Sequence, residues 1–113
     1  MSYLSVALLT FSAFLAAAGQ ICLKVGAQGR SSIAEFVNVP IAAGLLLYGA
    51  GVLIWIYVLA YEKLTNVYAF TALTFILVYL GAVVYIGEKI SILAGTGIFL
   101  VLAGLYLITN HNA

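Results

Sequence analysis

Two polar side chains, Gln20 and Lys24, lie inside or at the end of a long apolar run and could bind a ligand there. Together with Ala13 and Ala17 they follow the spacing i, i+4, i+7 and i+11, which places all four on one helical face. A lysine ammonium supplies a positive point charge, and a glutamine amide supplies two donors and an acceptor. The pair is therefore a candidate site for a phosphate and its attached polar groups. A lysine at a helix end can also simply reach the lipid headgroups, and the sequence leaves both interpretations open.

Aromatic side chains form a second set of candidates. Tyr48, Trp55 and Tyr79 lie deep in apolar runs, where a phenol or an indole needs a hydrogen-bond partner. They could line a polar cavity that binds a substrate, or they could form hydrogen bonds between helices. Tyrosines nearer the ends of the runs, namely Tyr61, Tyr68 and Tyr85, are more typical of the aromatic belt at a membrane interface.

No acidic side chain lies inside an apolar run, and side chains that could bind a metal are few and scattered. Glu35, Glu62 and Glu88 all stand at the ends of runs, His111 lies close to the C-terminus, and Cys22 is the only cysteine. The sequence shows no cluster of His, Cys and carboxylates for a metal, and no paired carboxylates or nucleophile–base arrangement. We therefore expect neither an enzyme nor a metal or other cofactor.

The composition assigns the chain to a membrane. Of its 113 residues 66% are hydrophobic and only 6% are charged, and the mean hydropathy is +1.26. Soluble domains carry roughly 25% charged residues. Four Lys/Arg and three Asp/Glu cannot cover the surface of such a chain in water. These numbers exclude a soluble enzyme, a secreted disulfide domain and a disordered tail, and they favour an integral membrane protein.

The charges divide the chain into four uncharged stretches, residues 3–23, 36–61, 64–87 and 90–113. About 20 helical residues cross the hydrocarbon core of a bilayer, so each stretch fits one crossing. The chain lacks the polar alternation of a membrane β-strand. We predict an all-α protein of a single domain, residues 1–113, in which the first run is retained as a helix. The four transmembrane helices are expected near residues 3–25, 40–61, 66–87 and 91–109.

The connections refine this layout. Asn38 is a plausible N-cap for the second helix, with Pro40 in its first turn, and a short helical turn is possible over residues 33–37. The other two connections, residues 62–65 and 88–91, are near copies, each with a Glu-Lys pair and then a hydroxyl that can cap the next helix. Connections this short predict that the second, third and fourth helices are antiparallel neighbours. The loop charges are nearly balanced, so the orientation in the membrane stays open.

The last helix carries a stripe of small residues, Ala94, Gly97, Val101 and Gly104. Small residues let membrane helices approach closely. The stripe could form a dimer contact, or it could pack against the third helix of the same chain.

Three segments resemble short members of the drug/metabolite transporter superfamily. Residues 19–24 (Gly-Gln-Ile-Cys-Leu-Lys) resemble the first-helix signature of the aminoarabinose–phosphoundecaprenol flippase subunits. Residues 87–91, which include Glu88 and Ser91, resemble the Gly-Glu-x-aliphatic-Ser motif of the superfamily. Residues 97–104 resemble the last helix, which is the dimerisation helix in the related small multidrug resistance family.

This resemblance implies a dimer, either of identical chains or with a paralogous subunit, in the cytoplasmic (inner) membrane of a prokaryote. The cargo that it implies is a polyprenyl-phosphate-linked sugar. The sequence departs from the small multidrug resistance pattern at position 16, where the membrane-embedded glutamate of that family is replaced by Ala16. Residues 72–75 lack the Gly-x-Gly of that family, and residues 69–71 read Ala-Phe-Thr where flippase subunits commonly have Ala-Tyr-Pro.

The leading hypothesis is a flippase that moves a lipid-linked sugar by alternating access, with Gln20 and Lys24 on the polar side of its groove. An acid-free groove suits an anionic cargo, because a buried carboxylate would repel phosphate. Two alternatives stay open: a small-molecule or drug exporter, and a non-transporting membrane subunit whose polar groups serve helix packing only.

Overall fold

The computed structural model describes residues 2–111, with the side chains of residues 2–107. The described part is helical and contains no strand. Its elements are α1 (Tyr3–Ala27), the 3-10 turn η1 (Ile33–Phe36), α2 (Val39–Leu59), α3 (Leu64–Tyr68), α4 (Thr71–Gly81), the π-turn η2 (Ala82–Ile86) and α5 (Ile92–His111). Three segments are long and apolar enough to cross a membrane: Tyr3–Ala27, Val39–Leu59 and Leu64–Ile86. A shorter apolar helix covers Ile92–Leu107. The predicted all-α architecture of four membrane helices is confirmed.

Local capping sets the ends of the first two helices. The Ser2 hydroxyl accepts a hydrogen bond from the Ser5 backbone N–H at 3.1 Å, which begins α1. Asn38 caps α2, as predicted, because its Oδ1 accepts from the Ile41 N–H at 3.0 Å. The Asn38 amide also donates to the Gly26 carbonyl at 2.9 Å. The end of α1 and the beginning of α2 are therefore joined by one side chain.

The third membrane span is not the single helix predicted over residues 66–87. It begins at Leu64 after Lys63, without a side-chain capping bond, so the predicted cap at Thr65 is wrong. It is interrupted after Tyr68, where the backbone tightens to i→i−3 hydrogen bonds, such as that from Phe70 N–H to Val67 O at 3.0 Å. It ends in the π-turn η2, which Gly87 closes in the left-handed conformation at φ 82°. Periodicity of apolar residues cannot reveal such an interruption, because both halves stay helical and apolar.

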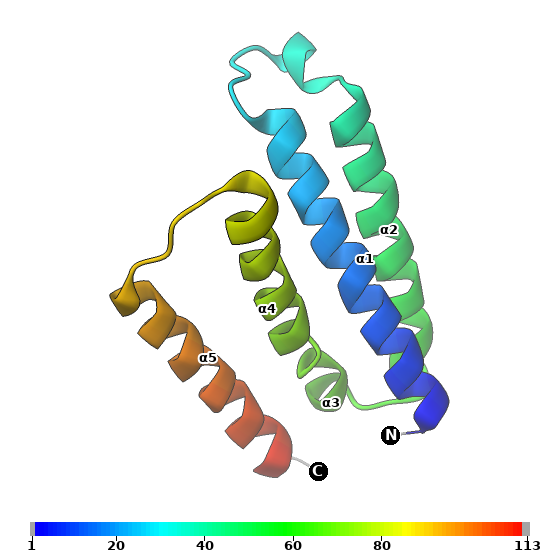
Figure 1. Cartoon of the computed structure of the whole chain (residues 1–113). Coiled ribbons are helices and arrows are strands. Elements are labelled where there is room, and N and C mark those ends of the chain that lie inside the picture. The colour runs from blue at the N-terminus through cyan, green and yellow to red at the C-terminus, as the bar shows by residue number, and fades with distance from the viewer. Residues whose placement is uncertain (1, 112–113) are drawn as a thin grey trace.

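Helix α1 lies between α2 and α4 (Figure 1), so α4 packs against α1 rather than along α2. The prediction that the second and third helices are antiparallel neighbours is therefore wrong along most of their length. The cause is a close crossing of α1 and α2: a Cβ at Gly19 would lie 2.8 Å from the Gly44 carbonyl oxygen. The buried Ser12 hydroxyl adds a hydrogen bond to the Gly51 carbonyl at 2.8 Å. The glycines let the backbones of α1 and α2 come into direct contact.

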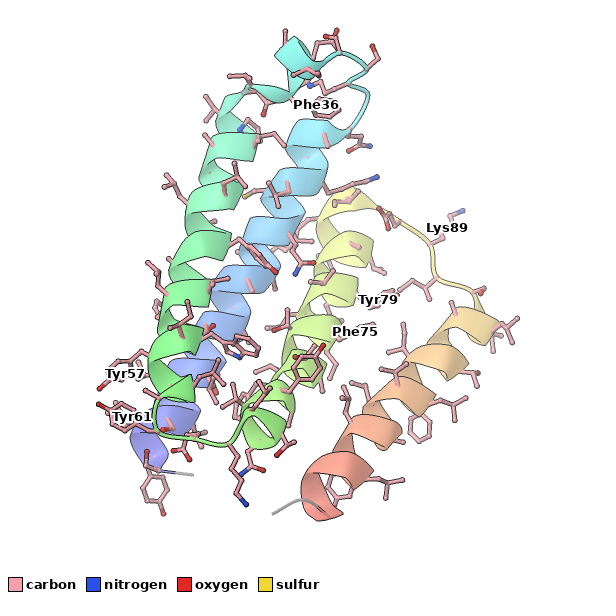
Figure 2. The ribbon with its side chains drawn as sticks, turned by 180° about the vertical axis from the view of Figure 1, so that it is seen from behind. Phe36, Tyr57, Tyr61, Phe75, Tyr79 and Lys89 are labelled. Carbon is pink, nitrogen blue, oxygen red and sulfur yellow. The ribbon has the colours of Figure 1, made fainter. Side chains whose placement is uncertain are left out.

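The core is small and lies near the N-terminal end of α1. Its fully buried side chains are Leu9, Val58 and Val67, and most other apolar side chains are exposed, as expected where lipid is the solvent. Figure 2 places Phe36 at one end of the molecule and Tyr57 and Tyr61 at the other.

Helix α5 stands on the far side of α4 and makes few contacts, with α3 and α4 (Figure 1). A Cβ at Gly97 or Gly104 would meet no atom within 4 Å. Gly97 and Gly104 therefore do not pack closely against the third span in the described part of the chain, and the dimer contact stays a prediction.

Candidate functional site

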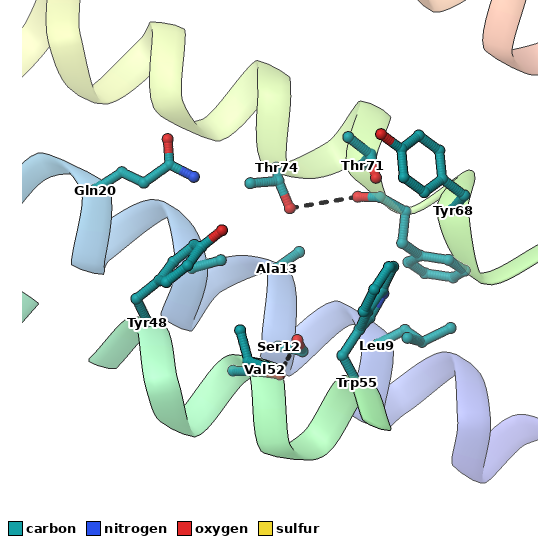
Figure 3. A pocket seen from close by; sticks show the side chains of 13 residues that line it. Leu9, Ser12, Ala13, Gln20, Tyr48, Val52, Trp55, Tyr68, Thr71 and Thr74 are labelled. Atoms are coloured by element: carbon teal, nitrogen blue, oxygen red, sulfur yellow. Dashed lines mark hydrogen bonds between the residues drawn. The ribbon is translucent and has the colours of Figure 1, made fainter. Parts of the chain in front are cut away.

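A cavity of about 320 Å³ lies in the membrane-spanning part, between α1, α2 and the interrupted third span (Figure 3). Its wall is apolar where α1 contributes Leu9, Ala13 and Ala16. Its polar lining comes from three segments and consists of Ser12, Gln20, Tyr48, Trp55, Tyr68, Thr71 and Thr74. No carboxylate or ammonium group lines it. The surface of the site is thus mostly apolar, with several polar side-chain groups and no formal charge.

Two of the lining hydroxyls already have partners. Ser12 donates to the Gly51 carbonyl, and the Thr74 hydroxyl makes a longer contact of 3.4 Å to the Phe70 carbonyl, drawn in Figure 3. These contacts hold helices and turns in place and leave those groups less available to a ligand.

The five other polar side chains of the lining have no hydrogen-bond partner in the described part of the chain: Gln20, Tyr48, Trp55, Tyr68 and Thr71. Figure 3 shows Gln20 and Tyr48 toward one end of the cavity and Trp55 toward the other. Trp55 is fixed there by a tilted contact with Tyr68, with ring centroids 6.3 Å apart. Unpaired polar groups are costly in hydrocarbon, so this arrangement favours occupation by a polar ligand.

Three of the five residues predicted to bind substrate therefore line one cavity, and two do not. Tyr79 lies outside the lining and packs against Phe75, with centroids 5.5 Å apart (Figure 2). Lys24 also lies outside it, one helical turn beyond Gln20. The part that any of the five plays in binding stays a prediction.

Lys24 faces Glu88 instead. The Lys24 ammonium lies 4.0 Å from a Glu88 carboxylate oxygen, and the two side chains are 51% and 48% exposed. The contact joins the end of α1 to the connection before α5. A half-exposed pair at this distance is weak, at about 0–1 kcal/mol, so an anion could displace Glu88. Ser91, in the same connection, caps α5 by accepting from the Ala94 N–H at 3.1 Å.

Sequence reasoning missed four polar residues of the lining, Ser12, Tyr68, Thr71 and Thr74. Ser12 could have been found, because it precedes Ala16 and Gln20 by four and eight residues and shares their helical face. The three others depend on the interruption of the third span, which no sequence pattern indicated.

The fold and the cavity together define a class: a small helical protein that spans the membrane several times and has an open, acid-free cavity with polar groups in its lining. No protein-family model matches the chain, and no solved structure matches it. Curated proteins do. A protein of Enterobacter sp. (strain 638) named "Probable 4-amino-4-deoxy-L-arabinose-phosphoundecaprenol flippase subunit ArnE" is 30% identical over 105 residues, 93% of this chain and 96% of that protein.

Two further relatives carry related names. The ArnE subunit of Sodalis glossinidius is 34% identical over 106 residues, 92% of this chain and 93% of its own length. An ArnF subunit of Shewanella sediminis is 39% identical over 70 residues, which cover 60% of this chain and 48% of that protein. The chain belongs to the family of aminoarabinose-phosphoundecaprenol flippase subunits, and the resemblance read from the sequence is confirmed. It is a multi-pass protein of the bacterial inner membrane.

Proposed function

We propose that this chain is a subunit of a flippase that carries a polyprenyl-phosphate-linked sugar across the inner membrane by alternating access. It acts as a transporter rather than as an enzyme and needs no cofactor. The observation that carries the proposal is the free polar lining of the cavity, with Gln20, Tyr48 and Trp55 unpaired inside a membrane span. These groups replace the water that a sugar headgroup loses on entering the bilayer.

The size and charge of the cavity support this cargo. Its volume of about 320 Å³ lies at the lower end of the range of roughly 300–1,000 Å³ for small-ligand sites. It suits a sugar headgroup, whereas a polyprenyl chain is far too long for it and stays in the lipid. Ala16 lines the cavity and offers a methyl group where a carboxylate would repel phosphate.

Lys24 is proposed to receive the phosphate at the mouth of this site. It lies four residues after Gln20, about 6 Å further along the helix axis. Its ammonium lies 4.0 Å from the Glu88 carboxylate, and the anionic headgroup takes the place of Glu88. Binding would then release the connection that leads to α5, which couples occupation of the site to movement of the last helix.

A second subunit is proposed to cover α5. The open space beside Gly97 and Gly104 would let another helix approach closely. The partner is a second copy of this chain or a paralogous subunit, in keeping with relatives that are named as two subunit types, ArnE and ArnF.

Transport in inner-membrane vesicles that contain the chain and its native partners tests the proposal. The substrate is an amino-sugar polyprenyl phosphate, and its translocation is read by the reach of a membrane-impermeant periodate to the sugar diol. Gln20→Leu should slow translocation by about tenfold, the effect of losing roughly one hydrogen bond from a desolvated site. Gln28→Leu is the matched control, because Gln28 is exposed beyond the end of α1.

Lys24→Glu should weaken binding of the anionic headgroup while cross-linking still detects the dimer. Normal binding by that variant would remove Lys24 from the site. Movement of soluble metabolites or drugs instead of the lipid would indicate an exporter. Full activity of both Gln20→Leu and Lys24→Glu would indicate a subunit whose polar groups serve only assembly.

A further inference from the structure

A second pocket, of about 410 Å³, lies at the opposite end of the bundle from Lys24. It forms where the beginning of α1 meets the end of α2, and Figure 2 shows Tyr57 and Tyr61 at this end of the molecule. Its polar lining consists of Ser2, Ser5, Tyr57, Tyr61 and Glu62. The pocket therefore contains a carboxylate, unlike the first cavity, which lies between α1, α2 and the interrupted third span.

The Glu62 carboxylate is held in place by hydrogen bonds from Ser5 and Ser2. The pKa of Glu62 is held below its ordinary value of 4.5 first by the hydrogen bond from the Ser5 hydroxyl, then by that from the Ser2 backbone N–H and by the positive charge of the N-terminal amine. The group is therefore ionised at neutral pH. Ser5 is itself buried, at 7% exposure. Among the described side chains, no lysine or arginine forms an ion pair with Glu62.

Two aromatic rings stand beside this carboxylate. Tyr57 and Tyr61 are one helical turn apart, with ring centroids 5.3 Å apart and planes tilted by 59°. Both rings are more than half exposed, so their faces are available to a ligand. An ammonium group binds to aromatic faces and forms charge-assisted hydrogen bonds with carboxylates. A single carboxylate with two tyrosines thus matches a primary ammonium better than a phosphate or a metal ion.

We propose that Glu62, Tyr57 and Tyr61 bind the ammonium group of an amino-sugar headgroup. The inference rests on the proposed function, because only a flippase for an amino sugar would bring such a headgroup to this end of the chain. Ser5, beside Glu62, and Lys24 are 19 positions apart on α1, which corresponds to about 28 Å of helix. One headgroup cannot span that distance. It therefore meets Lys24 through its phosphate at one face of the membrane and Glu62 through its amine at the other.

The test compares two lipids that differ only at the amine: an amino-sugar polyprenyl phosphate and its N-acetylated form, which is neutral at that position. Equilibrium binding is measured on the intact protein in nanodiscs, and translocation is measured in vesicles by periodate access to the sugar diol. The variant is Glu62→Gln, whose amide oxygen can still accept from Ser2 and Ser5. The matched control is Glu35→Gln, because Glu35 is an exposed carboxylate within η1, outside both pockets.

Wild-type protein should bind the amino lipid about tenfold more tightly than the N-acetyl lipid, and Glu62→Gln should abolish that preference. Tyr61→Leu should reduce the preference by a smaller factor, and Glu35→Gln should leave it unchanged. An equal loss for both lipids in Glu62→Gln would make Glu62 a structural tie between α1 and α2 and would overturn the ammonium site.

The outcomes also separate this inference from the proposed function. Translocation of both lipids without any effect of Glu62→Gln would overturn the ammonium site and leave the flippase standing. Amine-dependent binding through Glu62 without translocation of either lipid would support the site and overturn the flippase. Absence of both binding and translocation would overturn both.

Discussion

The crossing of α1 and α2 should fail when a single methyl group is added at Gly19. In Gly19→Ala the new Cβ would lie 2.8 Å from the Gly44 carbonyl oxygen and 2.8 Å from the Tyr48 backbone nitrogen. Both are backbone atoms, so no rotation of a side chain can relieve the contact. The distance is about 0.6 Å shorter than the 3.4 Å at which ordinary contact begins, so the two helices must separate by about that amount.

Such a separation damages both stability and the site. A rigid shift of about 0.6 Å would lengthen the hydrogen bond from Ser12 to Gly51, now 2.8 Å, to about 3.4 Å, beyond good geometry. Overpacking of this kind costs about 1–3 kcal/mol, which lowers the folding equilibrium constant by roughly 5- to 150-fold. Tyr48 is displaced in the same movement, so transport should fall together with stability.

Reversible unfolding in mixed detergent micelles measures this cost. The matched control is Gly49→Ala on α2, where an added Cβ meets no atom within 4 Å. That variant should be as stable as wild type or slightly more stable, because alanine favours a helix over glycine by up to about 1 kcal/mol. If Gly19→Ala and Gly49→Ala unfold alike, α1 and α2 do not cross through these glycines, and the placement of Tyr48 and Gln20 in one cavity loses its basis.

Three further outcomes are expected. Ala16→Glu should slow lipid-linked sugar translocation at least tenfold, because the new carboxylate repels phosphate. The neutral Ala16→Gln should slow translocation much less. Equal slowing by the two variants would show that the size of the side chain, rather than its charge, is responsible. Gly97→Leu combined with Gly104→Leu should shift the mass in detergent, read by light scattering, from dimer to monomer, and an unchanged mass would contradict the α5 interface. Because the pKa of Glu62 is lowered from 4.5 in the folded chain, its stabilising effect is complete above pH 4.5 and disappears as the pH falls through the lowered value. Wild type should therefore lose more thermal stability than Glu62→Gln between about pH 6 and 3, and parallel losses would remove Glu62 as the cause.

The cavity was only partly predictable from the sequence. Gln20, Tyr48 and Trp55 stand out because a polar group inside an apolar run needs a partner, and that requirement holds for any arrangement of the helices. Tyr79 meets the same criterion yet lies against Phe75, outside the cavity. Depth in the membrane indicates that a polar side chain faces protein, but it does not indicate which part of the protein.

The sequence by itself determined the features that depend on composition and local bonding. These are the membrane class, the approximate bounds of four apolar helices, and the caps at Asn38 and Ser91, since hydropathy and capping act within a few residues. Tertiary structure alone decided that α1 lies between α2 and α4, that the third span is interrupted after Tyr68, and that Lys24 faces Glu88. The physical reason is that lipid is as apolar as the side chains it solvates, so burial does not select which helix faces meet. Close approach at Gly19 and Gly44 makes that selection, and it becomes visible only when two helices are brought together.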